Sequence, residues 1–254
     1  MENTKTLSGL GATNIMSYTI LGENENVQMI KPCTVLLTPR SELEYSQVII
    51  EKAARKSHRS DHRFGKDSGF VKRVAIKFGH ESILEHRTAT FNFIINRAAS
   101  HQLVRHRIAA YTQSSQRFIN YSKDSMLICV PEPDFVQVPK AFELLIRDVG
   151  VCYDRYKDYI IWGFPPETAR DILPNCTMTE VVSTFNLRTW RHLFKERALN
   201  PKAQTMIRGI MQHALAALAE SLPTLFEDQL EILLDVENLD VRSHVDFWEE
   251  NMEE

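Results

Sequence analysis

The sequence predicts a single α+β domain, and two contrasting patterns support that class. Residues 85–96 alternate in the manner of a strand, with Ala89, Phe91 and Phe93 on one side. The C-terminal half instead carries amphipathic periods typical of helices, of which 141–163 is the longest. A chain of 254 residues is long enough to bury one substantial core, and it shows no internal repeat.

The N-terminal part combines strand and helix signals. Residues 1–26 are polar with few periodic apolar positions, so we expect a loose N-terminal extension there. Residues 27–37 suit a strand that Pro32 interrupts. A helix should follow from Ser41, because Ser41 and Glu44 have the spacing of a capping box.

The remaining elements follow in chain order. Residues 57–73 suit a basic loop, and Pro165 and Pro166 should break the helical pattern of the C-terminal half. We expect a short strand at 126–130 and helices at 97–107, 141–163, 167–173, 179–195 and 203–222. The end of the chain, 246–254, is an acidic tail, so the predicted domain spans 27–245.

Composition excludes several broad classes of protein. The net charge of −3 argues against nucleic-acid binding by overall charge, so any basic site must be local. No apolar run reaches the roughly 18 residues of a transmembrane helix, and the N-terminus lacks a signal-peptide core. His58 and His62 lack an evident third ligand, so we expect no metal site. Reduced thiols in a cytoplasmic protein best explain the scattered cysteines, Cys33, Cys129, Cys152 and Cys176.

Glycine-rich phosphate loops are missing from the sequence. The chain has nine glycines, and the pair Gly9 and Gly11 does not follow a strand pattern as a dinucleotide-binding fingerprint requires. No Walker-type loop is present either. If the protein binds a phosphorylated cofactor, arginine side chains must do what glycine-rich loops do elsewhere.

The most informative stretch is 105–117. The triplet Arg105-His106-Arg107 is followed by seven residues and then Ser115, and Arg117 adds another positive charge. Arginine forks bind phosphate and carboxylate oxygens in a bidentate manner, and such a stretch is costly to bury without an anionic partner. A solvated basic helix end remains the alternative for the triplet taken alone.

Four further clusters complement the triplet. Closely spaced His and Glu side chains at 80–86 suggest acid–base work or a turn that closes before the next strand. The spacing there differs from that of metalloproteases. The other clusters gather arginines beside amide or hydroxyl groups, at 167–170, 186–192 and 195–197.

Together these segments resemble the flavin-dependent thymidylate synthases. Arg105-His106-Arg107 with Ser115 resembles the signature of that family. Four more segments resemble family elements in the same order along the chain, at 53–57, 80–86, 167–174 and 186–204. The matches extend over roughly residues 43–210 and are highly specific in combination.

The resemblance implies an activity and a fold. The activity is methylation of C5 of dUMP to give dTMP, with methylenetetrahydrofolate as carbon donor, FADH2 as hydride donor and NADPH as the reductant of FAD. The fold is a mainly antiparallel sheet flanked by helices. The family also implies a cytoplasmic homotetramer in which subunits share active sites.

The resemblance also implies roles for individual residues. Arg197 would be catalytic, because a fixed positive charge can stabilise the negative charge that develops on the uracil ring. The nucleotide would be held by Gln102, Arg105, Gln113, Ser114, Ser115, Gln116, Arg117, Arg170 and Arg197. The flavin would be held by Ser57, His80, Ser82, Glu85, Arg105, His106, Arg107, Gln113, Asn186, Arg188 and His192.

Three positions depart from the family pattern. The family commonly has Ser, Asn and Glu where this chain has Ala110, Thr112 and Gln113. An amide at 113 donates as well as accepts, whereas a carboxylate only accepts. Another uracil nucleotide such as UMP is therefore an alternative substrate. A helical nucleic-acid-binding module, built from 97–117 and 186–197, is a remote alternative of another class.

Overall fold

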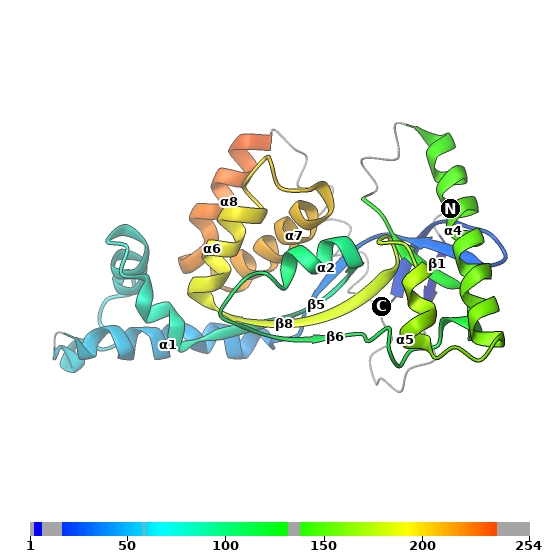
Figure 1. Ribbon diagram of the computed structural model, residues 1–254. Coiled ribbons are helices and arrows are strands. Elements are labelled where there is room, and N and C mark those ends of the chain that lie inside the picture. The colour runs from blue at the N-terminus through cyan, green and yellow to red at the C-terminus, as the bar shows by residue number, and fades with distance from the viewer. Residues whose placement is uncertain (1–2, 7–16, 58, 132–137, 238–254) are drawn as a thin grey trace. The chain divides into compact units, whose positions relative to one another are not determined.

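The computed structural model describes residues 3–6, 17–57, 59–131 and 138–237 (Figure 1). The chain divides into two compact units. The first unit takes residues 1–33, 93–105 and 112–181, and the second takes 34–92, 106–111 and 182–254. We predicted one domain over 27–245, but each unit draws on three separate stretches, so neither is a contiguous domain. The predicted boundaries stay predictions, and the tail at 246–254 lies outside the described residues.

The first unit contains a four-stranded sheet in the order β1-β2-β3-β7. Its strands are β1 Asn3–Thr6, β2 Ser17–Glu23, β3 Val27–Ile30 and β7 Met126–Cys129. Pairing is antiparallel except between β3 and β7, which run parallel. The prediction of a loose extension over 1–26 was wrong for β1 and β2. Backbone pairing of β1 with β2 and of β2 with β3 satisfies their polar groups, although the side chains show little periodicity.

One long helix packs against this sheet. Helix α4, Pro139–Ile161, supplies Val149 and Tyr153 to a buried cluster that includes Val27, Met29 and Ile128. The short helices α5, Pro166–Ala169, and η5, Arg170–Ile172, follow it, and η4 spans Tyr121–Lys123. The predictions of strand 126–130, helix 141–163 and a short helix after the prolines are confirmed.

A second four-stranded sheet has the order β4-β5-β8-β6. Its strands are β4 Cys33–Leu36, β5 Thr88–Asn96, β8 Met178–Asn186 and β6 Ala109–Gln113, and each has residues in both units. The strand predicted within 85–96 is confirmed. The segment 27–37 forms two strands of different sheets, β3 and β4, which are separated at Pro32.

Two helix predictions failed at this sheet. Residues 179–186 form β8 instead of the start of a helix, and burial alternates from Thr179 to Phe185 as a strand requires. The β-branched residues in this stretch favour that outcome. Helix α2 spans Arg97–Leu103 and ends before Arg105, because residues 109–113 are extended and paired in β6. The triplet therefore does not lie on a helix.

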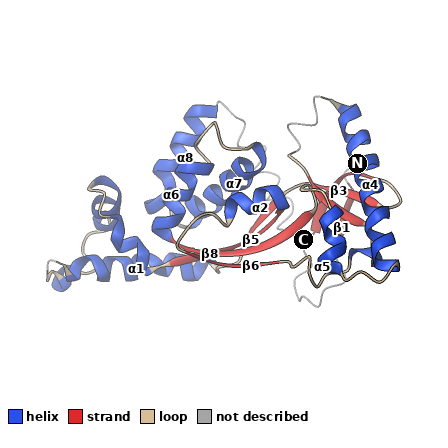
Figure 2. Cartoon of the chain, viewed as in Figure 1, coloured by secondary structure: helices blue, strands red, loops and turns tan. Residues whose placement is uncertain are grey.

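Helices dominate the second unit (Figure 2). They are α1 Arg40–Lys56, α6 Leu187–Arg197, α7 Thr205–Ser221 and α8 Pro223–Glu237, with shorter turns η1 Asp61–Arg63, η2 Lys72–Lys77 and η3 Glu81–His86. We did not predict α8. The capping box was also wrong, since Pro39 is the N-cap of α1 and makes no side-chain cap.

The core of the second unit centres on Trp190, which is fully buried. Its ring lies 4.9 Å from that of Phe91 and 4.7 Å from that of Phe185, and its Nε1 donates to Ala89 O at 3.0 Å. Phe194 stacks on the same ring. This cluster fixes α6 on strands β5 and β8, so the polar residues of α6 have a rigid support. Within the described chain, no helix is long and apolar enough to cross a membrane.

Candidate active site

The predicted site residues divide between the two units, and the two sets are named the first-unit cluster and the second-unit cluster. The first-unit cluster contains every predicted nucleotide residue except Arg197: Gln102, Arg105, Gln113, Ser114, Ser115, Gln116, Arg117 and Arg170. The second-unit cluster contains Ser57, His80, Ser82, Glu85, His106, Arg107, Asn186, Arg188, His192 and Arg197. The division between the units passes between Arg105 and His106, inside the triplet.

Gln113 is the best-anchored side chain of the first-unit cluster. Its Nε2 donates to Ser100 Oγ at 2.9 Å and to Thr179 Oγ1 at 3.1 Å, and both hydroxyl-bearing residues are buried. Ser100 Oγ in turn donates to Arg97 O at 2.9 Å. Because the proton of Ser100 is already used, its oxygen must accept from position 113. An amide can satisfy this network, but a carboxylate cannot.

The segment that follows is arranged by backbone contacts. Ser114 N donates to Glu180 O at 3.0 Å, and Ser115 Oγ accepts from Arg117 N at 3.3 Å. Arg117 is exposed, and its Nε donates to Glu167 Oε2 at 3.0 Å. A phosphate that binds Arg117 would compete with this exposed ion pair, which costs little because such pairs contribute about 0–1 kcal/mol.

A pair of arginines adds a residue that the sequence did not predict. Arg97 opens α2 and is partly buried, and burial lowers the pKa of its guanidinium. The hydroxyl of Tyr121 opposes this change, whereas the positive charge of Arg170 lowers the Arg97 pKa further. Among the described residues, neither arginine forms an ion pair with a carboxylate. Two like charges in a partly buried place suit an anion such as a phosphate. Partial burial of Arg97 has no signal in the sequence.

Helix α6 positions the arginines of the second-unit cluster. Asn186 is its N-cap, with Oδ1 accepting from Thr189 N at 2.8 Å, so that side chain begins the helix as the residue type favours. Two residues on, Arg188 Nη1 lies 2.5 Å from Glu85 Oε1. Both side chains are about half exposed, so this ion pair stabilises the fold little. Glu85 lies in η3 with the exposed Ser82, next to the exposed His80.

Arg191 is buried and was not predicted as part of the site. Its guanidinium binds both carboxylate oxygens of Asp228 at 2.8 and 2.7 Å and Glu81 Oε1 at 3.0 Å, and it also donates to Leu225 O. These contacts join α6, α8 and η3. Arg191 therefore holds in place the turn that carries Ser82 and Glu85.

Arg197, at the end of α6, has a different kind of partner. Its Nε donates to Nε2 of His106 at 3.0 Å. Burial, the positive charge of Arg197 and then His192 together lower the pKa of His106 to about 4, against a smaller opposing effect of Glu196. His106 is therefore a neutral acceptor at pH 7. In the described part of the chain, Arg197 makes no ion pair with a carboxylate.

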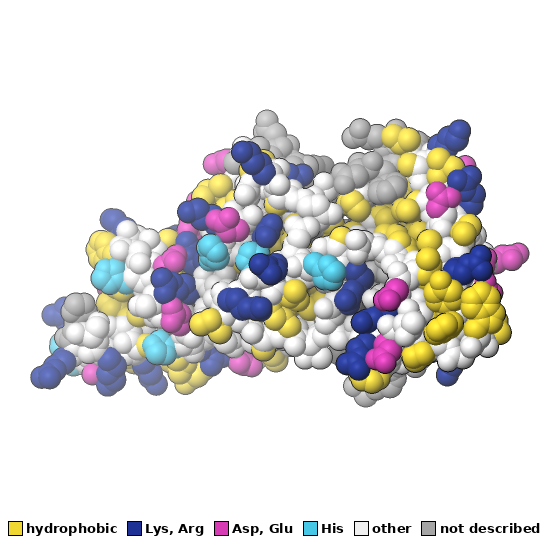
Figure 3. All heavy atoms as spheres, in the orientation of Figure 1, with side chains coloured by type: hydrophobic (Ala, Val, Ile, Leu, Met, Phe, Trp, Pro, Cys, Tyr) yellow, Lys and Arg dark blue, Asp and Glu magenta, His cyan; other side chains and the backbone are white. Residues whose placement is uncertain are grey.

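Two other features of the second unit help to define the site. Ser57 Oγ donates to Ala54 O at 2.9 Å, at the end of α1, and the ring of His80 lies edge-on to Phe78 at 6.5 Å. The space-filling view of the chain shows histidine, lysine and arginine side chains on one face, with acidic side chains among them (Figure 3). These nitrogen donors suit an anionic ligand with several acceptor oxygens.

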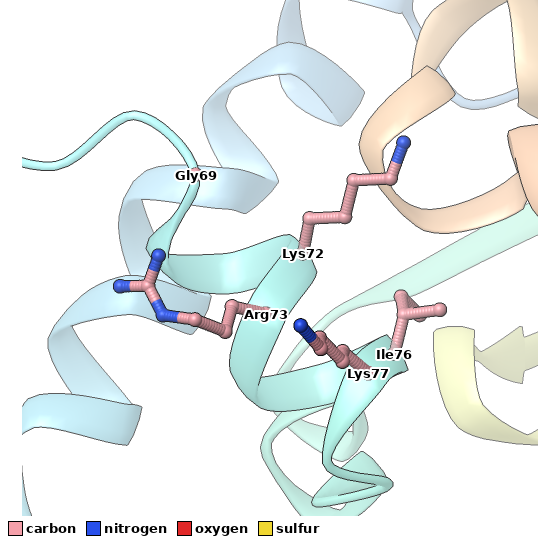
Figure 4. A pocket seen from close by; sticks show the side chains of 5 residues that line it. All are labelled: Gly69, Lys72, Arg73, Ile76 and Lys77. Carbon is pink, nitrogen blue, oxygen red and sulfur yellow. The ribbon is translucent and has the colours of Figure 1, made fainter.

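A separate hollow of about 310 Å³ lies beside η2 (Figure 4). It is lined by Gly69, Lys72, Arg73, Ile76 and Lys77. Lys72 Nζ is 3.0 Å from Glu227 Oε2, and Arg73 pairs with Asp67. Because two of the three cations already have carboxylate partners, this hollow is less suited to an anion than the surroundings of Arg197. No described group of three or more His, Cys, Asp or Glu side chains could hold a metal ion.

The nucleic-acid-binding alternative does not agree with this geometry. It required a continuous basic helix over 97–117, but α2 ends at Leu103. Its second helix was expected over 186–197, where α6 is present but Arg188 and Arg191 bind carboxylates.

Comparisons with known proteins agree on one family. A family model described as "Thymidylate synthase complementing protein" matches residues 41–224. A relative named flavin-dependent thymidylate synthase from Geobacter sulfurreducens is 35% identical over 185 residues, which cover 72% of this chain and 76% of the relative. The chain therefore belongs to the flavin-dependent thymidylate synthase family, as its motifs predicted.

Solved structures confirm the predicted fold. A UMP/dUMP methylase, PolB, from Streptomyces cacaoi bound with 5-Br dUMP has a TM-score of 0.65 at 21% identity, covering 80% of this chain and 95% of that one. Thymidylate Synthase X from Helicobacter pylori with FAD and dUMP has a TM-score of 0.62 at 21% identity, covering 78% and 99%. At these identities the likeness shows the α+β fold.

Proposed function

We propose that this chain methylates C5 of dUMP to give dTMP as a flavin-dependent thymidylate synthase. The observation that carries the proposal is Arg197, a half-buried guanidinium held by a neutral histidine in a chain of this family. A positive charge that no carboxylate neutralises can stabilise the negative charge that develops on the uracil ring when C5 becomes nucleophilic. The family relatives are named thymidylate synthases, so dUMP is favoured over UMP as the substrate.

Phosphate recognition is the proposed role of the arginines in the first-unit cluster. Arg170, Arg117 and Arg105 supply guanidinium forks, and Gln102 and the hydroxyl and amide groups of 113–116 supply further donors and acceptors. The resemblance assigns these groups to the nucleotide. The partial burial of Arg97, whose pKa the positive charge of Arg170 also lowers, supports a phosphate site in this unit.

The second-unit cluster suits FAD. Its members supply imidazole, guanidinium and hydroxyl donors, and the positive charges of Arg197 and His192 add to the burial that lowers the pKa of His106. Such a donor set fits the diphosphate and the ring acceptors of a flavin dinucleotide. When bound, FAD supplies the hydride that completes the methyl group. Arg107, Arg188, His192 and Asn186 would bind and orient it, together with Ser57, His80, Ser82 and Glu85.

Thiolate catalysis does not fit three of the four cysteines of this chain. Burial raises the pKa of Cys33 to about 12 and that of Cys176 to about 11, and it raises the pKa of Cys129 as well. These thiols stay protonated at pH 7 and are poor nucleophiles. Activation of the uracil ring therefore falls to Arg197 and not to a covalent adduct with these cysteines.

The resemblance supplies the rest of the proposal. Methylenetetrahydrofolate is the proposed carbon donor and NADPH the proposed reductant. We also propose a homotetramer with shared active sites and a cytoplasmic location.

Release of tritium from C5-labelled dUMP tests the proposed function. Parallel reactions contain dUMP or UMP with FAD, NADPH and methylenetetrahydrofolate under low oxygen. Release from dUMP with formation of dTMP is the expected result. Release of tritium from UMP alone would identify UMP, and not dUMP, as the substrate. Release from neither nucleotide, with flavin bound to the protein, would overturn the proposed reaction.

A further inference from the structure

The contact between Arg197 and His106 leaves most of the arginine available. An arginine has five N–H donors, and here the one on Nε is used by the imidazole. Among the described residues, the Arg197 side chain makes no other hydrogen bond or ion pair. The terminal nitrogens, Nη1 and Nη2, therefore keep the fork that binds planar oxygen-containing groups.

The contact also defines the protonation state of the histidine. To accept from Arg197, Nε2 of His106 must carry no proton, so the single proton of the neutral ring lies on Nδ1. The groups that face the ring are Arg197, His192 and Glu196, and two of these three disfavour a positive imidazole. The ring is thus a permanent acceptor toward Arg197 near neutral pH.

The backbone of His106 is held by a second contact. The hydroxyl of Tyr111 donates to His106 O at 2.8 Å. The Tyr111 ring meets Phe185 edge-on at 5.6 Å, and Phe185 is 1% exposed. Burial raises the Tyr111 pKa to about 12, so the hydroxyl remains a donor. A continuous line of contacts therefore connects the buried core of β8 to Arg197.

We propose that His106 is a positioning residue, which holds Arg197 through Nε and leaves its terminal fork for the uracil ring without neutralising its charge. This inference rests on the proposed function for the identity of the ligand. A carboxylate in place of His106 would hold the arginine equally well, but it would cancel the charge that stabilises the activated ring. A neutral imidazole orients the group and keeps its charge.

The first test reads the histidine directly. Long-range ¹H–¹⁵N NMR of histidine-labelled holoenzyme at pH 7 distinguishes the two nitrogens of each imidazole. For His106, assigned from the H106Q spectrum, we expect an unprotonated Nε2 and a protonated Nδ1 in the wild type. In R197A this preference should weaken. A protonated Nε2 in the wild type would overturn the inference. This measurement does not depend on turnover, so it separates a failure of the inference from a failure of the proposed function.

The second test compares two replacements of the ring. Gln can place an acceptor oxygen close to the position of Nε2, whereas Leu cannot. We expect H106L to reduce the rate of tritium release from dUMP by about 10–100-fold, the effect of one lost orienting contact, and H106Q to recover most of that loss. FAD content and the thermal midpoint identify variants that fail to fold.

A double substitution shows whether His106 acts through Arg197. The variant R197K keeps a positive charge but lacks the guanidinium Nε. Compared with R197K alone, the double variant R197K/H106L should release tritium at a rate lower by no more than about 2-fold. An equal loss in both backgrounds, or an H106Q as impaired as H106L, would overturn the inference. His62 is exposed and lies outside both clusters, so H62L is the matched control and should retain wild-type turnover.

Discussion

Arg191 and Arg197 lie on the same helix, yet their surroundings give them opposite properties. Arg191 is 8% exposed and is neutralised by Asp228 and Glu81. Arg197 is half-buried and has a neutral imidazole as its partner. The first arrangement uses the charge to join helices, and the second keeps the charge for a ligand. The identity of the partner, and not of the arginine, distinguishes a structural residue from a functional one.

The largest expected effect is on catalysis at the end of α6. R197A should reduce tritium release from dUMP by about 10²–10³-fold, the usual effect of removing a group that stabilises charge in the transition state. Its free energy of unfolding should change by less than about 1 kcal/mol, because one hydrogen bond to a neutral acceptor is lost. Steady-state rates and urea denaturation measure the two quantities. If R197A turned over dUMP at the wild-type rate, Arg197 would have no catalytic role that distinguishes it from Arg191.

The next effect is on stability at Arg191. R191L should lower the free energy of unfolding by about 2–4 kcal/mol, because Asp228 and Glu81 lose their partner in a partly buried place. Urea denaturation monitored by circular dichroism measures the loss. The matched control is R188A, whose exposed pair with Glu85 should contribute at most about 1 kcal/mol. Equal losses in both variants would show that burial of Arg191 is unimportant.

Acid should expose a third difference, since the partner of Arg197, His106, titrates in mildly acidic solution. The folded pKa of His106, about 4, lies below its ordinary value of about 6.5, so the unfolded chain binds a proton first. The titration of His106 therefore leaves the free energy of unfolding unchanged above pH 6.5. That free energy falls as the pH drops from 6.5 to about 4. We expect a loss of about 1–2 kcal/mol, reduced because the ring is half exposed. Unfolding of H106Q should lack this component over the same range, and an identical pH dependence would contradict the assignment.

The smallest expected effect extends the comparison to the first unit, where Gln113 is also held by neutral partners. Q113E should lower the free energy of unfolding by about 1 kcal/mol, because a carboxylate cannot donate to Ser100 Oγ or Thr179 Oγ1. Thermal unfolding of the variant provides the measurement. Thr112 is exposed, so T112N is the control and should change stability by less than about 0.5 kcal/mol. If Q113E were as stable as the wild type, the hydroxyls of Ser100 and Thr179 would have to rotate and donate to the new carboxylate.

Local patterns in the chain predicted much of the fold. Strand β5 was predicted from alternating apolar and polar residues, and helices α4 and α7 from their amphipathic periods. Both patterns arise between neighbouring residues, and all three elements are present. β8 was mistaken for a helix because its flanking residues continue a helical pattern into α6. The pairing of β1 and β2 was missed because backbone hydrogen bonds, which have no sequence signal, hold them.

By itself the sequence determined the family, since the ordered motifs with the triplet at 105–107 are a property of residue type and spacing. Only the tertiary structure decided which arginine is neutralised and which is not. Arg188, Arg191 and Arg197 are equivalent along the chain, but Glu85, Asp228 and His106 come from distant segments. Charge and hydrogen bonding depend on distance in space, and folding alone brings those partners within 3 Å or so of their arginines.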